Sequence, residues 1–176
     1  MSYREIPAAD VPELHPVAGF SQFWAEAKGA DAVPLRANIE PTKIPAILPW
    51  ILLLEAIEVD EIVQFRYRLT GSGCREIFGI DFTGKLLGED LTPEGADIRR
   101  REFISVMTTG KPIYSQTEIP IVGREFINVY RGVFPVSRLG KCIDQIFIVI
   151  AHEALRLVTA SPIARTRRPQ AHLSSL

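Results

Sequence analysis

Few side chains in this sequence could carry out acid–base or metal chemistry, and their positions argue against a catalytic centre. The three histidines are His15, His152 and His172, so the long middle part of the chain has none. We therefore expect no histidine general base and no histidine haem ligand at the centre of the fold. The pair His152-Glu153 begins like the zinc-protease motif HExxH, but Arg156 stands at the second ligand position, so no metal site is expected.

Two further patterns that can support chemistry are incomplete. The glycine-rich loop 71–73 follows a predicted strand and opens a predicted helix, as a dinucleotide-binding loop does, but the third glycine of that motif is missing. Adjacent carboxylates at 60–61 and 89–90 lie in predicted turns without a neighbouring base, which is typical of solvated loop charges. These patterns favour a protein that binds over an enzyme, and we predict no catalytic residues.

Period-two alternation and long apolar runs predict five strands. Residues 63–70 alternate apolar with basic or polar side chains, and residues 50–59 are almost continuously apolar. These two strands are expected to form a hairpin through a turn at the adjacent carboxylates. Three more strands are predicted at 113–121, 125–136 and 142–152. The last of them is apolar on both faces and is expected to be central in the sheet.

Three helices accompany these strands. Apolar side chains at positions 20, 23, 24 and 27 have the spacing of an amphipathic helix that ends near Gly29. A short helix is predicted over 74–78, and a longer one begins at Pro93 after the capping residue Thr92 and runs to about Thr109. Three glycines are expected to occupy turn conformations that β-branched residues resist: Gly71, Gly79 and Gly84.

The order of strand, glycine turn, short helix and second glycine turn in residues 63–91 resembles the PAS domain. The matching residues are Gly71, Gly79, Asp81, Thr83, Gly84, Leu86, Leu87 and Leu91. Residues 34–41 and 67–71 also resemble one bacterial family of short, single-domain PAS proteins. The resemblance implies an α+β fold, with a five-stranded antiparallel sheet, helices on one face and an N-terminal amphipathic helix. It also implies a sensor or regulatory role in signal transduction, with a small-molecule ligand or a signalling protein as partner.

In such a fold, a ligand would lie between the inner face of the sheet and the helices of residues 74–109. An apolar or aromatic ligand would suit the predicted lining residues, which are Tyr67, Phe78, Phe103, Met107, Tyr130 and Phe134. Arg100 shares the inward stripe of the long helix and either holds an anionic ligand or extends outward to solvent. Arg66 and Arg68 share one face of their strand and are expected to form ion pairs with Glu118 or Asp144.

Cys74 invites comparison with the light-sensing PAS subclass, in which a cysteine attacks a bound flavin. In that subclass the cysteine lies after the third glycine turn, near residues 88–91 of this chain, whereas Cys74 lies in the preceding helix. A role as a small buried apolar residue is therefore favoured for Cys74, and Cys142 is interpreted as structural. We predict no cofactor and a colourless purified protein.

Two alternatives to a ligand sensor stay open. In the first, the large apolar residues fill the interior as ordinary core, and the function lies in protein contacts. In the second, the chain is an enzyme on a cone-shaped α+β fold, which the lack of a central histidine and of an assembled nucleophile disfavours.

The composition is that of a single cytoplasmic domain. With 176 residues and 47% hydrophobic residues, the chain can form one core, which we place at residues 20–155 between an irregular arm at 1–19 and a basic tail at 156–176. The formal net charge of −1 gives no general attraction to nucleic acid or to an acidic membrane. The tail is interpreted as a solvated extension rather than a binding arm.

Strands that are apolar on both faces predict a homodimer. Only one face can meet the domain's own helices, so part of the rest is expected to form an apolar patch, drawn from Leu53, Ile57, Val129, Val133, Ile146 and Ile148. The helix with the 20–27 stripe either folds back onto its own sheet or reaches a second copy. Four apolar positions are few for three strands, so the second arrangement is favoured.

Overall fold

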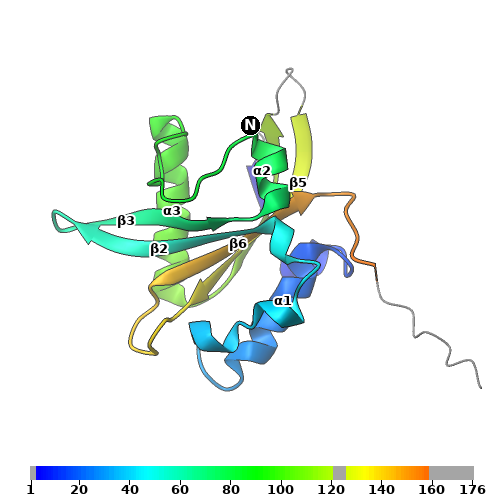
Figure 1. Ribbon diagram of the computed structural model, residues 1–176, viewed down its shortest axis with the longest axis horizontal. Helices are drawn as coiled ribbons and strands as arrows, with labels where there is room; N and C mark the ends of the chain where they lie inside the picture. Colours follow the sequence, from blue (N-terminus) through cyan, green and yellow to red (C-terminus); the bar gives the residue numbers. More distant parts are fainter. Residues whose placement is uncertain (1–2, 121–125, 159–176) are drawn as a thin grey trace, which may run out of the picture.

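A computed structural model describes residues 3–120 and 126–158 of the chain, and these residues form an α+β fold around one antiparallel sheet (Figure 1). The strand order is β1-β4-β5-β6-β2-β3. The strands are β1 (Tyr3–Ile6), β2 (Ile51–Val59), β3 (Ile62–Thr70), β4 (Ile113–Pro120), β5 (Phe126–Val136) and β6 (Gln145–His152). The α-helices are α1 (Pro16–Lys28), α2 (Ser72–Phe78) and α3 (Pro93–Thr109). Short 3-10 helices are η1 (Ala8–Asp10), η2 (Arg36–Asn38), η3 (Pro41–Lys43) and η4 (Leu48–Trp50).

The sheet has six strands rather than the five predicted, because the N-terminal arm is not irregular. It contains β1, η1 and the start of α1, and β1 pairs with β4 from Tyr3 opposite Thr117 to Ile6 opposite Tyr114. The side chain of Ile6 is buried. A strand of four residues is too short to show a clear alternation in sequence, so its pairing partner decides its structure.

The predicted hairpin and the central position of the last strand are confirmed. β2 and β3 pair through a turn at Asp60 and Glu61, whose φ angles are 51° and 63°. β6 lies between β5 and β2, and its side chains are buried on both faces of the sheet. Along β6, alternate residues therefore contribute to two separate cores.

Helices cover both faces of the sheet, not one as predicted. On the face that we call inner, α2 and α3 pack over apolar side chains that include Leu54, Phe65, Val133 and Ile148. On the opposite face, which we call outer, α1 and the 35–50 connector pack over Leu53, Phe134, Phe147 and Val149. Figure 1 shows α3 and α1 on opposite sides of the strands.

Helix α1 folds back onto its own sheet. The Nε1 atom of Trp24 donates a hydrogen bond to the carbonyl of Pro135 at 2.8 Å, and the ring of Phe20 lies 4.9 Å from that of Phe134. Gly132 permits this close approach, because a Cβ atom there would lie 2.8 Å from a methyl group of Val17. The connector adds three buried isoleucines to the same cover: Ile39, Ile44 and Ile47.

The apolar patch on which the dimer prediction rested is therefore largely buried within one chain. Val129, Val133, Ile146 and Ile148 face the inner core, and Leu53 lies beneath the outer cover. Ile57 alone of the six predicted residues lies beyond both cores, partly exposed. The four apolar positions of α1 are indeed few, but the connector provides the missing cover.

Candidate functional site

Several of the predicted ligand-binding residues fill the inner core by contact with one another or with their neighbours. The Phe103 ring meets the Phe65 ring edge-on at 5.1 Å, and the Tyr67 ring stacks on Phe82 at 5.1 Å. The Phe78 ring is 5.3 Å from Phe82. Met107 is partly buried against the same core. These four predicted residues are thus brought to one face, where they are packed as core side chains.

The other two predicted aromatic residues lie on the opposite face of the sheet. Phe134 packs against Phe20 and Tyr114 in the outer core, and Tyr130 meets the His15 ring edge-on at 5.1 Å. The structure therefore does not unite the predicted set. β5 is apolar on both faces, so its sequence does not indicate which alternate residues face α3.

Arg100 lies on α3, where its Nε atom is buried without a hydrogen-bond partner among the described residues. Next to it in sequence begins a buried charge network that the sequence analysis missed. Glu102 accepts hydrogen bonds from Arg131 at 2.6 Å and from the Tyr3 hydroxyl at 3.2 Å, and Arg99 lies 3.4 Å away. This network joins α3 to β5 and β1. Only the folded register brings these residues together, so nothing in the sequence pattern marks it.

The arginines of this network control the ionisation of Glu102. Burial opposes the charged form of Glu102, but the charge of Arg131 and its hydrogen bond outweigh this and hold the pKa of the carboxyl group below its usual value. Burial and the nearby Glu102 charge raise the pKa of Tyr3 to about 12. Glu102 is therefore ionised at neutral pH, and its carboxylate is held by Arg131, Tyr3 and Arg99.

The two cysteines have opposite environments. Cys74 is buried in the inner core, and burial raises the pKa of its thiol to about 12, which suits an apolar packing role. Cys142 is exposed in the loop between β5 and β6. In the part of the chain that the structure describes, no group of three or more His, Cys, Asp or Glu side chains is placed to hold a metal ion.

The outer face carries a cavity of about 60 Å³, which we call the arginine cleft. It lies between the 35–50 connector and strands β2, β3 and β6, and its lining residues are Arg36, Ile39, Pro41, Ile44, Leu48, Ile51, Leu53, Leu69 and Phe147. The guanidinium of Arg36 lies 5.4 Å from the centre of the Phe147 ring and donates a hydrogen bond to the carbonyl of Ile39 at 3.1 Å. The cleft is apolar apart from this one cationic group.

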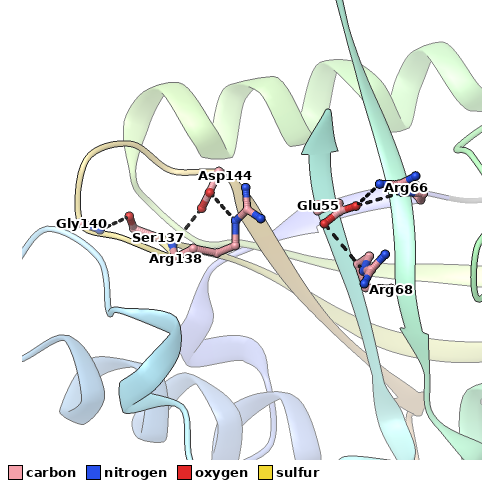
Figure 2. Close-up of polar contacts among 7 residues, drawn as sticks. All are labelled: Glu55, Arg66, Arg68, Ser137, Arg138, Gly140 and Asp144. Atoms are coloured by element: carbon pink, nitrogen blue, oxygen red, sulfur yellow. Dashed lines mark hydrogen bonds and ion pairs between the residues drawn. The ribbon is translucent and has the colours of Figure 1, made fainter. Parts of the chain in front are cut away.

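A polar cluster continues the same face of the sheet beside the cleft (Figure 2). Glu55 accepts two hydrogen bonds from Arg66, at 2.9 and 2.6 Å, and lies 3.7 Å from Arg68. Arg138 donates to Asp144 at 2.6 Å. Among the described residues, Glu55 is therefore the carboxylate that the two arginines of β3 share.

The predicted partners of Arg66 and Arg68 were wrong. Glu55 lies directly opposite Arg66 in the β2–β3 register, whereas Asp144 is engaged by Arg138. Glu118 lies on β4, from which β3 is separated by three strands. The register shift between Leu53 and Leu54 leaves Arg68 as an extra residue in β3, so that Arg68 contacts Glu55 while the next residue, Leu69, lines the cleft. The cluster and the cleft therefore adjoin.

The fold is an antiparallel sheet in which β3 is followed by glycine turns and a short helix. This is the arrangement that the resemblance to the PAS domain implied. The family model of the PAS domain matches residues 13–122, which is more than half of the chain. The chain belongs to the PAS domain family. Among its described residues, no helix has both the length and the hydrophobicity that a membrane span requires.

One solved structure that this chain is similar to is titled "Structure of an RNA-binding Light-Oxygen-Voltage Receptor". The sequence identity is 12% and the TM-score is 0.42, over 68% of this chain and 35% of that chain. This chain thus spans about a third of the length of that receptor. No curated protein sequence matches the chain.

Proposed function

We propose that this chain is a regulatory PAS module that binds a protein partner through the outer face of its sheet. PAS domains are generally sensor or regulatory modules, which supports action by binding rather than by catalysis. The observation that carries the proposal is that the two faces differ. Both faces have packed aromatic side chains, but the outer face also has a cleft that adjoins the exposed side chain of Arg68.

The packing of the inner face supports this choice over an internal ligand. Phe103 and Phe65 are almost fully buried and make an edge-to-face contact, as core aromatic residues do. A ligand in the predicted position would have to displace such contacts. Truncating a buried phenylalanine costs about 3–5 kcal/mol, which indicates the scale of packing energy that a ligand would have to replace.

A second candidate, an internal ligand sensor, is favoured by two polar atoms. The Ser115 hydroxyl and the Arg100 Nε atom are buried without hydrogen-bond partners in the described part of the chain. Buried polar groups normally have partners, so a small polar ligand near α3 would satisfy them. Identification of a co-purifying small molecule by mass spectrometry would favour this candidate.

Photo-cross-linking in cells tests the proposed function. A photoreactive amino acid replaces Leu69 at the arginine cleft, and a matched variant carries it at Ile104 on α3; these side chains are 45% and 43% exposed. We expect protein cross-links from position 69 and few from position 104. Cross-links that arise only from position 104, or from neither position, would contradict binding through the outer face.

A further inference from the structure

The β2–β3 hairpin carries apolar side chains into solvent at its tip. Figure 1 shows this tip projecting away from the rest of the molecule. Val59 and Ile62 lie opposite each other in the register and are 38% and 54% exposed. Along β2, Val59 alternates in step with Leu53 and Glu55, so the exposed pair lies on the outer face. This part of the outer face lies beyond both cores.

The turn at the tip is acidic. Asp60 and Glu61 are exposed, and neither forms an ion pair within residues 3–120 and 126–158. Both residues have positive φ angles, as the two-residue hairpin turn of type I′ requires. The tip therefore presents two carboxylates beside two exposed aliphatic side chains.

The arginine cleft presents the complementary chemistry at the other end of the same hairpin. Arg36 has no carboxylate partner within the described residues, and Arg66 and Arg68 share Glu55. Exposed aliphatic surface is present there too, because Leu48 and Leu69 are 37% and 45% exposed. The cleft of about 60 Å³ is lined mainly by aliphatic side chains, so it suits an aliphatic side chain of a partner.

We propose that two copies of this chain pair through their outer faces, with each hairpin tip seated in the arginine cleft of the other copy. Leu53 and Val59 are six residues apart, about 20 Å along an antiparallel strand. A two-fold axis near Ala56, midway between them, places each tip on the partner's cleft. The two Glu55 clusters then face each other, and because each has two arginines and one carboxylate, their like net charges oppose the pairing, so the two tip–cleft contacts supply the attraction. The inference rests on the proposed function, because it names the partner bound at the outer face.

Charge complementarity favours a second copy over the chain's own C-terminal segment as the occupant. Residues 155–176 contain four arginines, at 156, 165, 167 and 168, and no acidic residue, so they carry the same sign of charge as the cleft. The hairpin tip has the opposite sign and adds aliphatic side chains. Of these two segments, only the tip combines negative charge with exposed aliphatic side chains, which match the arginine and the apolar lining of the cleft.

The test is a charge swap in the full chain, measured by sedimentation equilibrium. Glu61→Arg and Arg36→Glu each place like charges at both contacts of the dimer, whereas an equimolar mixture of the two variants restores opposite charges at both contacts. We expect the wild type to dimerise at micromolar concentration and each variant alone to raise Kd about tenfold or more. The mixture should recover the wild-type value. Arg101→Glu, the same charge change at an exposed position on α3, is the matched control and should have no effect.

A second substitution keeps the test valid if a charge variant folds poorly. Ile62→Lys removes the aliphatic contact at the tip, while Val63→Lys changes an exposed residue on the other face of the hairpin. We expect only Ile62→Lys to weaken the dimer. A monomeric wild type, or a mixture of the charge variants that stays monomeric, overturns the inference. Cross-links from position 69 to other proteins would then leave the proposed function standing with a different partner.

Discussion

At the scale of single residues, one ion pair among the described residues has both of its side chains buried. Glu102 and Arg131 are both buried, and their oxygen and nitrogen atoms are 2.6 Å apart between α3 and β5. Removing one member of such a pair leaves an uncompensated buried charge, which is far more costly than losing a surface pair. Substituting one member of each kind of pair and measuring the free energy of unfolding tests this difference.

We predict that Glu102→Gln lowers the free energy of unfolding by about 3–5 kcal/mol, because Arg131 would then be buried without a counter-ion. The matched control is Lys43→Met, which removes the exposed ion pair between Lys43 and Glu40 at 2.7 Å and should cost less than about 1 kcal/mol. Urea denaturation at pH 7 measures both values. Equal losses in the two variants would show that the buried pair contributes no more than a surface pair.

His15 is the second residue with an uncommon role. It is fully buried, and its Nδ1 atom accepts a hydrogen bond from the backbone NH of Val17 at the start of α1, while Nε2 donates to the carbonyl of His152 at 3.1 Å. Burial lowers the pKa of His15 from 6.5 to about 4. Only the neutral ring can accept the bond from Val17, so protonation removes the cap of the helix.

The sign of the pH effect follows from that lowered pKa. The unfolded chain binds a proton near pH 6.5 and the folded chain only near pH 4, so stability is full above pH 6.5 and is lost as the pH falls between these values. We predict a loss of about 2 kcal/mol from this group between pH 7 and pH 5. His15→Asn keeps a capping oxygen that does not titrate, and denaturation at both pH values should show a smaller change. An unaltered pH dependence in this variant would exclude His15 as the source.

At the scale of elements, the sequence predicted best where local signals dominate. The Thr92 cap, Pro93 at the first position and the end of α3 at Thr109 all lie where expected, and the helix is closed by Gly110 with a φ of 67°. The faces of β5 were not predictable, because both are apolar. The arginine cleft was also missed, since it depends on the fold of the 35–50 connector and on a register shift in β2–β3.

The glycines of the 71–84 segment show the same limit. Gly79 and Gly84 have φ angles of 69° and 88°, as the turn argument requires. Gly71 has an ordinary φ of −63°, and it is needed for a different reason. A Cβ atom there would lie 2.3 Å from the carbonyl oxygen of Pro49. Sequence identifies the glycine but not which constraint acts on it.

These two constraints predict different responses to substitution. Gly79→Ala should cost about 1 kcal/mol, and Gly79→Asn less, because asparagine tolerates the left-handed conformation. Gly71→Ala should cost more than Gly79→Ala, since the obstacle is backbone that cannot move aside freely. Thermal unfolding of the three variants gives the order. If Gly79→Asn is as unstable as Gly71→Ala, the distinction between strain and collision is wrong.

At the scale of the whole molecule, the structure differs most from the sequence prediction in the short strand β1 and in the 35–50 connector. They extend the sheet by one strand and complete a second core, so the chain buries both faces of its central strands. The proposed binding surface consists of the hairpin tip and the arginine cleft. The proposed function therefore requires that the inner face is packed core and that binding occurs outside it.

Native mass spectrometry of freshly purified protein tests this claim most directly. If Tyr67, Phe103 and their neighbours fill the inner face, the spectrum should show bare chains, as monomer or dimer, with no additional small molecule. Denaturing the same sample provides the reference mass of the chain alone. A small molecule bound in stoichiometric amount to the native chain, and lost from a Phe103→Trp variant that retains its fold, would place a ligand in the inner face and contradict the account.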